Sequence, residues 1–149
     1  MGSASSANPA IVERGVIGPT LCVGLTMRSA TEAISPLVDR LMKLIKVSHC
    51  ISGDGCDVEI ALREALANAV LHGNRQDLRK KVHVLCRLNP GRELSLVIRD
   101  EGSGFDPVRV PDSTAIENIN FEGARGICLM NAFMDEVHFD QGGTAVRLR

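Results

Sequence analysis

Aromatic residues and an excess of charge are what this sequence lacks most clearly. It has no tryptophan or tyrosine, and its four phenylalanines all lie at or after Phe105. A platform of aromatic rings that stacks the bases of single-stranded nucleic acid is therefore not expected. The 17 Lys and Arg residues are balanced by 18 Asp and Glu residues, which gives a net charge of −1. A chain so close to neutrality has no long-range attraction for nucleic acid or anionic lipid, so we expect neither as a direct partner.

Long apolar runs and paired cysteine motifs are missing as well. No stretch of about 18 apolar residues occurs, so the sequence predicts no membrane span. The five cysteines are an odd number without a Cys-x-x-Cys pair, which favours reduced thiols in the cytoplasm. His49, Cys50 and Cys56 have no fourth ligand nearby, and loop and core roles are favoured over a metal site.

The sequence does contain enough apolar material for one folded domain. Its 149 residues are 44% apolar, and a single domain usually has roughly 100–200 residues. Residues 1–16 have small side chains without a basic start or an apolar run, and we expect a flexible tail rather than a secretion signal. Residues 17–149 are expected to form the domain.

Apolar spacing predicts an alternation of strands and helices. Segments rich in β-branched residues or with period-two alternation predict five strands, at Thr20–Met27, Lys81–Leu88, Glu93–Arg99, Glu136–Asp140 and Thr144–Leu148. Helical spacing predicts three helices, with apolar faces over 37–45, about 57–71 and 126–134. This order favours an α+β fold in which the helices pack on one face of a mostly antiparallel sheet.

The start of the first helix has two interpretations. Ser29 and Glu32 have the spacing of a capping box, but Pro36 would then lie inside the helix. With Ser35 as the cap, Pro36 becomes the first helical residue, where proline is accepted.

The second helix carries an unusual second polar stripe. At about 100° per residue, Glu64, Asn68 and His72 share a stripe that is separate from both the core face and the solvent face. The stripe is either a second solvated edge, or a carboxylate and an amide one turn apart facing a ligand. An amide oxygen suits Mg²⁺, and a carboxylate can accept a proton. We interpret His72 as a helix-end residue, with Gly73 left-handed after it.

Two glycine-rich segments complete the pattern. Asp100 ends an apolar strand and is followed by Gly102 and Gly104, which would let the backbone approach a flat ring while the carboxylate accepts from an adenine amine. The same pattern is also typical of an ordinary turn between strands. Neither the GxxxxGK[ST] phosphate-binding motif nor the HRD and DFG motifs of protein kinases is present.

The second segment leads into the third helix. Free N–H groups at a helix start bind phosphate oxygens, and the residues before this one are small or flexible. Arg125 either adds positive charge there or is simply solvated. The segment consists of Gly123, Ala124, Arg125 and Gly126.

Taken together, three segments resemble the N, G1 and G2 boxes of the GHKL ATPase superfamily. They are Glu64–Asn74, Arg99–Pro107 and Gly123–Val137. The short form, with Phe-Met-Asp-Glu-Val after the last box, is similar to the anti-sigma-factor serine/threonine protein kinases. The resemblance covers about residues 20 to 149 and implies the two-layer α/β sandwich of the Bergerat-type ATP-binding fold, with a mixed, mostly antiparallel sheet.

Roles for individual residues follow from this resemblance. Glu64 matches the glutamate that activates the attacking hydroxyl, and Asn68 matches the Mg²⁺ ligand. Asp100 matches the adenine-reading aspartate, with Gly102 and Gly104 shaping its pocket.

The resemblance also places a phosphate-binding loop, a lid and a residue near the adenine. Gly123, Ala124, Arg125 and Gly126 match the loop, with Ala124 where the family often has glycine. Residues 107–122 correspond to the ATP lid, and Thr144 matches a small polar residue near the adenine.

The function implied is that of an ATP- and Mg²⁺-dependent serine/threonine protein kinase of a bacterial partner-switching module. Its substrate would be an anti-anti-sigma protein of the STAS type, and it would sequester a sigma factor or similar regulator. Members of this family commonly pair as homodimers, which the residues themselves do not decide. The alternative is an ATP-gated protein-binding regulator without kinase activity; the intact Glu64 favours the kinase.

Overall fold

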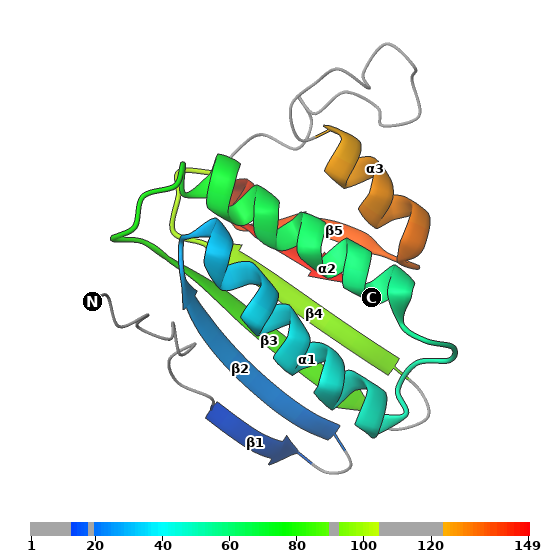
Figure 1. Cartoon of the computed structure of the whole chain (residues 1–149). Coiled ribbons are helices and arrows are strands. Elements are labelled where there is room, and N and C mark those ends of the chain that lie inside the picture. The colour runs from blue at the N-terminus through cyan, green and yellow to red at the C-terminus, as the bar shows by residue number, and fades with distance from the viewer. Residues whose placement is uncertain (1–12, 18–19, 90–92, 105–123) are drawn as a thin grey trace, which may run out of the picture.

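An antiparallel sheet forms one layer of the domain. The computed structural model describes residues 13–17, 20–89, 93–104 and 124–149 (Figure 1). In this part of the chain, six strands follow the order β1-β2-β3-β4-β6-β5, and every neighbouring pair is antiparallel. The strands are β1 (Glu13–Ile17), β2 (Thr20–Arg28), β3 (Lys81–Asn89), β4 (Glu93–Asp100), β5 (Val137–Asp140) and β6 (Ala145–Leu148). The α+β sheet expected from the sequence is confirmed, without a parallel pair among the described strands.

Helices form the second layer and cover one face of the sheet (Figure 1). They are α1 (Ile34–Ser48), α2 (Cys56–Asn68) and α3 (Ala124–Phe133), and α2 continues into a π-helical turn, Ala69–Gly73. Helix α2 lies between the other two and packs against both. In the described residues, every helix falls short of what crossing a bilayer requires in length and apolar character.

The core lies between the two layers, and the strands supply it with alternate residues. Along β3, Val82, Val84, Cys86 and Leu88 are buried, while the residues between them are more exposed. Their partners across β4 include Ile98, opposite Val84. Because side chains alternate between the faces of a strand, this period of two assigns one face to the helices and fixes the register of the sheet.

Strand β1 corrects the predicted N-terminal tail. It begins at Glu13, inside the segment 1–16 that the sequence assigns to a flexible tail, and pairs with β2 through register pairs such as Gly15 with Cys22. An edge strand is held by backbone hydrogen bonds to its neighbour, so it does not need an apolar pattern that a sequence could reveal. Residues 1–12 lie outside the described residues.

Both predicted caps of the first helix are wrong. Helix α1 begins at Ile34, with Ala33 before it and no side-chain cap, and a 3-10 turn, Thr31–Ala33, leads into it. Pro36 therefore occupies the third helical position. It is tolerated there because the N–H groups of the first turn have no acceptor within the helix, so a missing N–H costs little.

Candidate functional site

The second polar stripe of α2 faces the first turn of α3. A Cβ atom built on Gly126 would lie 2.8 Å from Glu64 Oε2, 3.3 Å from Asn68 Nδ2 and 3.5 Å from Asn68 Oδ1. Residues four apart lie on the same side of a helix, so α2 presents the carboxylate and the amide together. Gly126 is buried and the other two are half-buried. Glu64 and Asn68 therefore face α3, whereas His72, the third residue of the stripe, is exposed to solvent.

Helix α3 begins immediately before this contact. Ala124 is its first residue and Gly126 its third, so the first-turn N–H groups, which lack acceptors within a helix, lie beside Glu64 and Asn68. The positive end of the helix dipole adds to the attraction for anions there. Arg125 is exposed to solvent. Gly123 and the expected lid, residues 107–122, lie outside the described residues.

A second group of site residues gathers at the end of β4. The Asp100 side chain is nearly buried, at 9% exposure, and its Oδ1 accepts a hydrogen bond of 2.8 Å from the Gly102 N–H. The Asp100 N–H donates to the Thr144 carbonyl oxygen over 2.9 Å, so the residue predicted near the adenine does adjoin Asp100. Burial raises the pKa of Asp100, while the Gly102 N–H and the charge of Lys80 act to lower it.

Glycines allow the segments around Asp100 to approach one another closely. A Cβ on Gly102 would overlap the Gly73 carbonyl oxygen, and one on Gly73 would overlap the Asp100 carboxylate. Gly104 has a φ of +78°, and its Cβ would overlap the Gly142 carbonyl oxygen. These contacts join the end of α2, the turn after β4 and the turn before β6 at one place.

Gly73 differs from its predicted conformation. It lies in the π-helical turn rather than in the left-handed region, which Arg75 and Gln76 adopt two and three residues later, with φ of 52° and 58°. A glycine is needed at position 73 because of the approach of Asp100, not because of its own φ. His72 is exposed, in keeping with a residue at a helix end.

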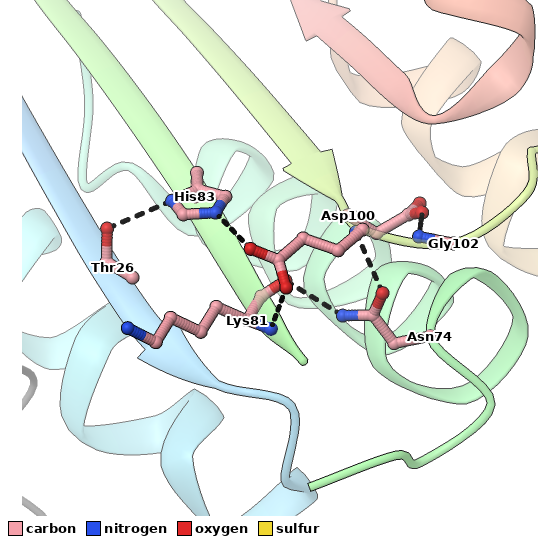
Figure 2. Close-up of polar contacts among 7 residues, drawn as sticks. Thr26, Asn74, Lys81, His83, Asp100 and Gly102 are labelled. Carbon is pink, nitrogen blue, oxygen red and sulfur yellow. Dashed lines mark hydrogen bonds and ion pairs between the residues drawn. The ribbon is translucent and has the colours of Figure 1, made fainter. Parts of the chain in front are cut away.

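Sequence reasoning missed Asn74, which is fully buried at the same place. Its side-chain Oδ1 accepts from the Glu101 N–H over 2.8 Å and its Nδ2 donates to the Lys81 carbonyl over 2.9 Å (Figure 2). Glu101 was also missed, although it follows Asp100 directly. Hydrogen bonds from His83 and from the Lys81 N–H lower the pKa of Glu101. A signal for Asn74 was its place in the helix-ending sequence His-Gly-Asn.

The two groups are connected by α2. Glu64 and Asn68 lie in its α-helical part, and Gly73 ends its π-helical turn. Of the predicted site residues that the structure describes, those of the second and third helices meet at one group, and those of the turn after β4 and the turn before β6 meet at the other.

The oxygen atoms of Asn68 and Glu64 suit a metal ion that takes most of its ligands from phosphate and water. In the described residues, no three His, Cys, Asp or Glu side chains gather as a metal site. The Asn68 amide, with Glu64 beside it, offers a hard oxygen donor of the kind that Mg²⁺ takes together with phosphate oxygens and water.

Comparison with known proteins confirms the resemblance stated from the three boxes. The family model described as "Histidine kinase-like ATPase domain" matches residues 27–149. The anti-sigma F factor of Bacillus subtilis is 31% identical over 98 residues, which cover 62% of this chain and 66% of that protein. The anti-sigma F factor of Shouchella clausii is 33% identical over 84 residues, which cover 54% of this chain and 56% of that protein. The chain thus spans 66% and 56% of the lengths of these two curated relatives, in both cases less than two thirds.

Proposed function

The chain belongs to the histidine kinase-like ATPase domain family, and from this premise we propose that it is a serine/threonine protein kinase of a bacterial partner-switching module. It would bind ATP, phosphorylate a Ser or Thr of an anti-anti-sigma protein of the STAS type, and sequester a sigma factor or similar regulator. Its relatives' name, anti-sigma F factor, supports the last part. We expect it to act in the cytoplasm, where its free cysteines would stay reduced.

The observation that carries this proposal is the contact of Gly126 with Glu64 and Asn68. It brings a helix start, which suits phosphate oxygens, next to a carboxylate and an amide. Phosphoryl transfer depends on positioning and on neutralising charge more than on covalent chemistry by the protein, so this small set of groups is sufficient in kind.

Glu64 would serve as the base. Its carboxylate is half-buried and lies against the start of α3, where the terminal phosphate is expected. It would accept the proton of the substrate hydroxyl as that oxygen bonds to the γ-phosphorus and ADP departs. Asn68 would hold Mg²⁺ through its amide oxygen, and the bound ion would neutralise phosphate charge.

The remaining predicted residues would bind the nucleotide. The Asp100 carboxylate would accept from the exocyclic amine of adenine, and Gly102 and Gly104 would shape its pocket by letting the neighbouring backbone segments pack closely. Thr144 would lie at the same end, because its carbonyl accepts from the Asp100 N–H. The phosphates would lie at the loop of Gly123, Ala124, Arg125 and Gly126.

Transfer of label from γ-labelled ATP to purified STAS-type proteins of the same organism tests the proposal. We expect transfer by the wild-type chain and its loss in Glu64→Ala and Asn68→Ala. Glu59→Ala is the matched control, because Glu59 lies on the same helix but pairs with Arg63 over 3.0 Å. Unchanged transfer in Glu64→Ala would exclude Glu64 as the base.

A second candidate function would be indicated by a different result. Binding of ATP by the wild-type chain without transfer to any of these proteins would support the ATP-gated binding regulator instead. Asp100→Asn tests the adenine contact by itself. It should weaken ATP binding whether the chain is a kinase or an ATP-gated binding regulator.

A further inference from the structure

Three hydrogen bonds form a closed ring next to the backbone of Asp100 (Figure 2). The Asn74 Nδ2 donates to the Lys81 carbonyl oxygen over 2.9 Å, and the Lys81 N–H donates to Glu101 Oε2 over 3.0 Å. The Glu101 N–H donates to Asn74 Oδ1 over 2.8 Å and closes the ring. The ring joins the end of α2, the start of β3 and the end of β4.

The ring is extended along the sheet by a histidine. His83 Nε2 lies 2.9 Å from Glu101 Oε1, and its Nδ1 lies 3.1 Å from Thr26 Oγ1 (Figure 2). Both carboxylate oxygens of Glu101 therefore have partners on β3, and its side chain is held against that strand. Glu101 is thus held at its backbone N–H by Asn74 and at its carboxylate by β3.

Asn74 is the member of the ring best placed to act on Asp100. It is fully buried and follows Gly73, whose Cα packs on the Asp100 carboxylate. A side-chain amide donates and accepts at once, which a carboxylate cannot do. Without that amide, the Glu101 N–H and the Lys81 carbonyl would lose their buried partner, and the Asp100–Glu101 peptide would lose the hydrogen bond from its N–H that fixes its orientation.

We propose that Asn74 is a positioning residue for base recognition: it fixes the Asp100–Glu101 peptide and thereby aims the Asp100 carboxylate at a purine that bears an exocyclic amine. This inference rests on the proposed function, since the role of Asp100 toward the base belongs to it. Asn74 itself does not contact the nucleotide.

A purely structural role for Asn74 makes a different prediction. General loosening of the domain would weaken every nucleotide alike. Loss of aim at Asp100 would specifically reduce the preference for ATP over inosine triphosphate. That nucleotide carries an oxygen in place of the amine, so it offers Asp100 no donor at position 6, and its only donor on that edge is the neighbouring N1–H.

The experiment compares the affinities of ATP and inosine triphosphate for the full chain. We expect the wild type to prefer ATP, and Asn74→Ala to reduce that preference by about fivefold, the worth of one well-aligned hydrogen bond. The double variant Asn74→Ala, Asp100→Asn should lose no more preference than Asp100→Asn alone, because Asn74 acts through Asp100.

Two further variants keep the test decisive. Asn74→Asp has the same shape and retains an acceptor for the Glu101 N–H. Its buried carboxyl group should be protonated, and the O–H can then donate to the Lys81 carbonyl in place of the amide, so we expect a smaller loss of preference than in Asn74→Ala. Val38→Ala is the control for stability alone: Val38 is fully buried in α1 and belongs to the core. It should lower the melting temperature and leave the preference for ATP unchanged.

The outcomes distinguish this inference from the function on which it rests. A wild-type chain that binds neither nucleotide would overturn both. A wild type that prefers ATP, with the same preference in Asn74→Ala and Asn74→Asp, would overturn the role of Asn74 alone. A loss of preference in Val38→Ala as large as in Asn74→Ala would assign the effect to stability and overturn the inference as well.

Discussion

The backbone of Gly73 lies against the carboxylate of Asp100 so closely that the two positions leave no room for one methyl group. A Cβ on Gly73 would overlap one carboxylate oxygen and lie 2.9 Å from the other. Residues 27 apart in sequence are thereby in contact at the place where the adenine is expected. The substitutions that add or remove a few atoms near this contact are the most informative tests of the site.

Gly73→Ala should weaken ATP binding and lower stability. Its methyl group would displace the Asp100 carboxylate, and overpacking of this kind costs about 1–3 kcal/mol. Isothermal titration with ATP and thermal melts measure the two effects. Gly53→Ala is the control. A Cβ on Gly53 would have no atom within 4 Å, although the residue has a φ of +79°. It should lose stability through backbone strain and keep its ATP affinity; unaltered affinity in Gly73→Ala would contradict the placement of the base.

Gly126→Ala should separate activity from stability. The nearest atom to the new Cβ is Glu64 Oε2, at 2.8 Å, the end of a flexible side chain that can move aside. Alanine also favours helix over glycine by up to about 1 kcal/mol. We therefore expect an unchanged or raised melting temperature, with phosphoryl transfer reduced by roughly 10–100-fold because the base is displaced. Full transfer by a folded Gly126→Ala protein would argue against Glu64 as the base.

Ser29→Ala should stabilise the domain. Ser29 is fully buried, and its Oγ has no hydrogen-bond partner among the described residues. Removing an unpaired buried hydroxyl is expected to raise the free energy of unfolding by about 1 kcal/mol, measurable by urea denaturation. Ser48→Ala should do the reverse, because the Ser48 hydroxyl donates to the Ile45 carbonyl over 2.7 Å. A loss of stability in Ser29→Ala would show that its hydroxyl is paired.

Glu101→Gln should change how stability depends on pH. The His83 and Lys81 hydrogen bonds lower the pKa of Glu101 in the folded chain below its ordinary value of 4.5. The carboxylate therefore stabilises the fold fully above that value, and its contribution is lost as the pH falls through the lowered pKa. Wild type should melt above Glu101→Gln at pH 7, and the difference should shrink in acid. Because the side chain is 41% exposed, the effect should be modest, and a constant difference would contradict this role.

Local pattern was enough to predict most of the secondary structure. The alternation of Val82, Val84 and Cys86 predicts β3, because a strand with one buried face must repeat every two residues. Pairing of an edge strand such as Glu13–Ile17 needs only backbone groups, so its residues carry no such pattern. The beginning of α1 was missed for a related reason, since it has no side-chain cap.

The candidate site was predictable where its residues follow a local spacing or match a family motif. The stripe of Glu64 and Asn68 follows from helical spacing, and the meeting of Asp100 with Thr144 follows from the family resemblance. The role of Asn74 depends on hydrogen bonds to Lys81 and Glu101, seven and 27 residues away, which no local period reveals.

One continuous helix carries both the carboxylate proposed as the base and the glycine beside Asp100. The spacing between the two groups of site residues is therefore fixed by the pitch of that helix. An α-helix advances about 1.5 Å and turns about 100° with each residue, and the π-helical turn that continues α2 also rotates the chain with every residue. Inserting or deleting a single residue between Asn68 and Gly73 would leave each group chemically intact and yet turn one away from the other. That short segment therefore sets how the group at Glu64 and the group at Gly73 are spaced and oriented relative to each other.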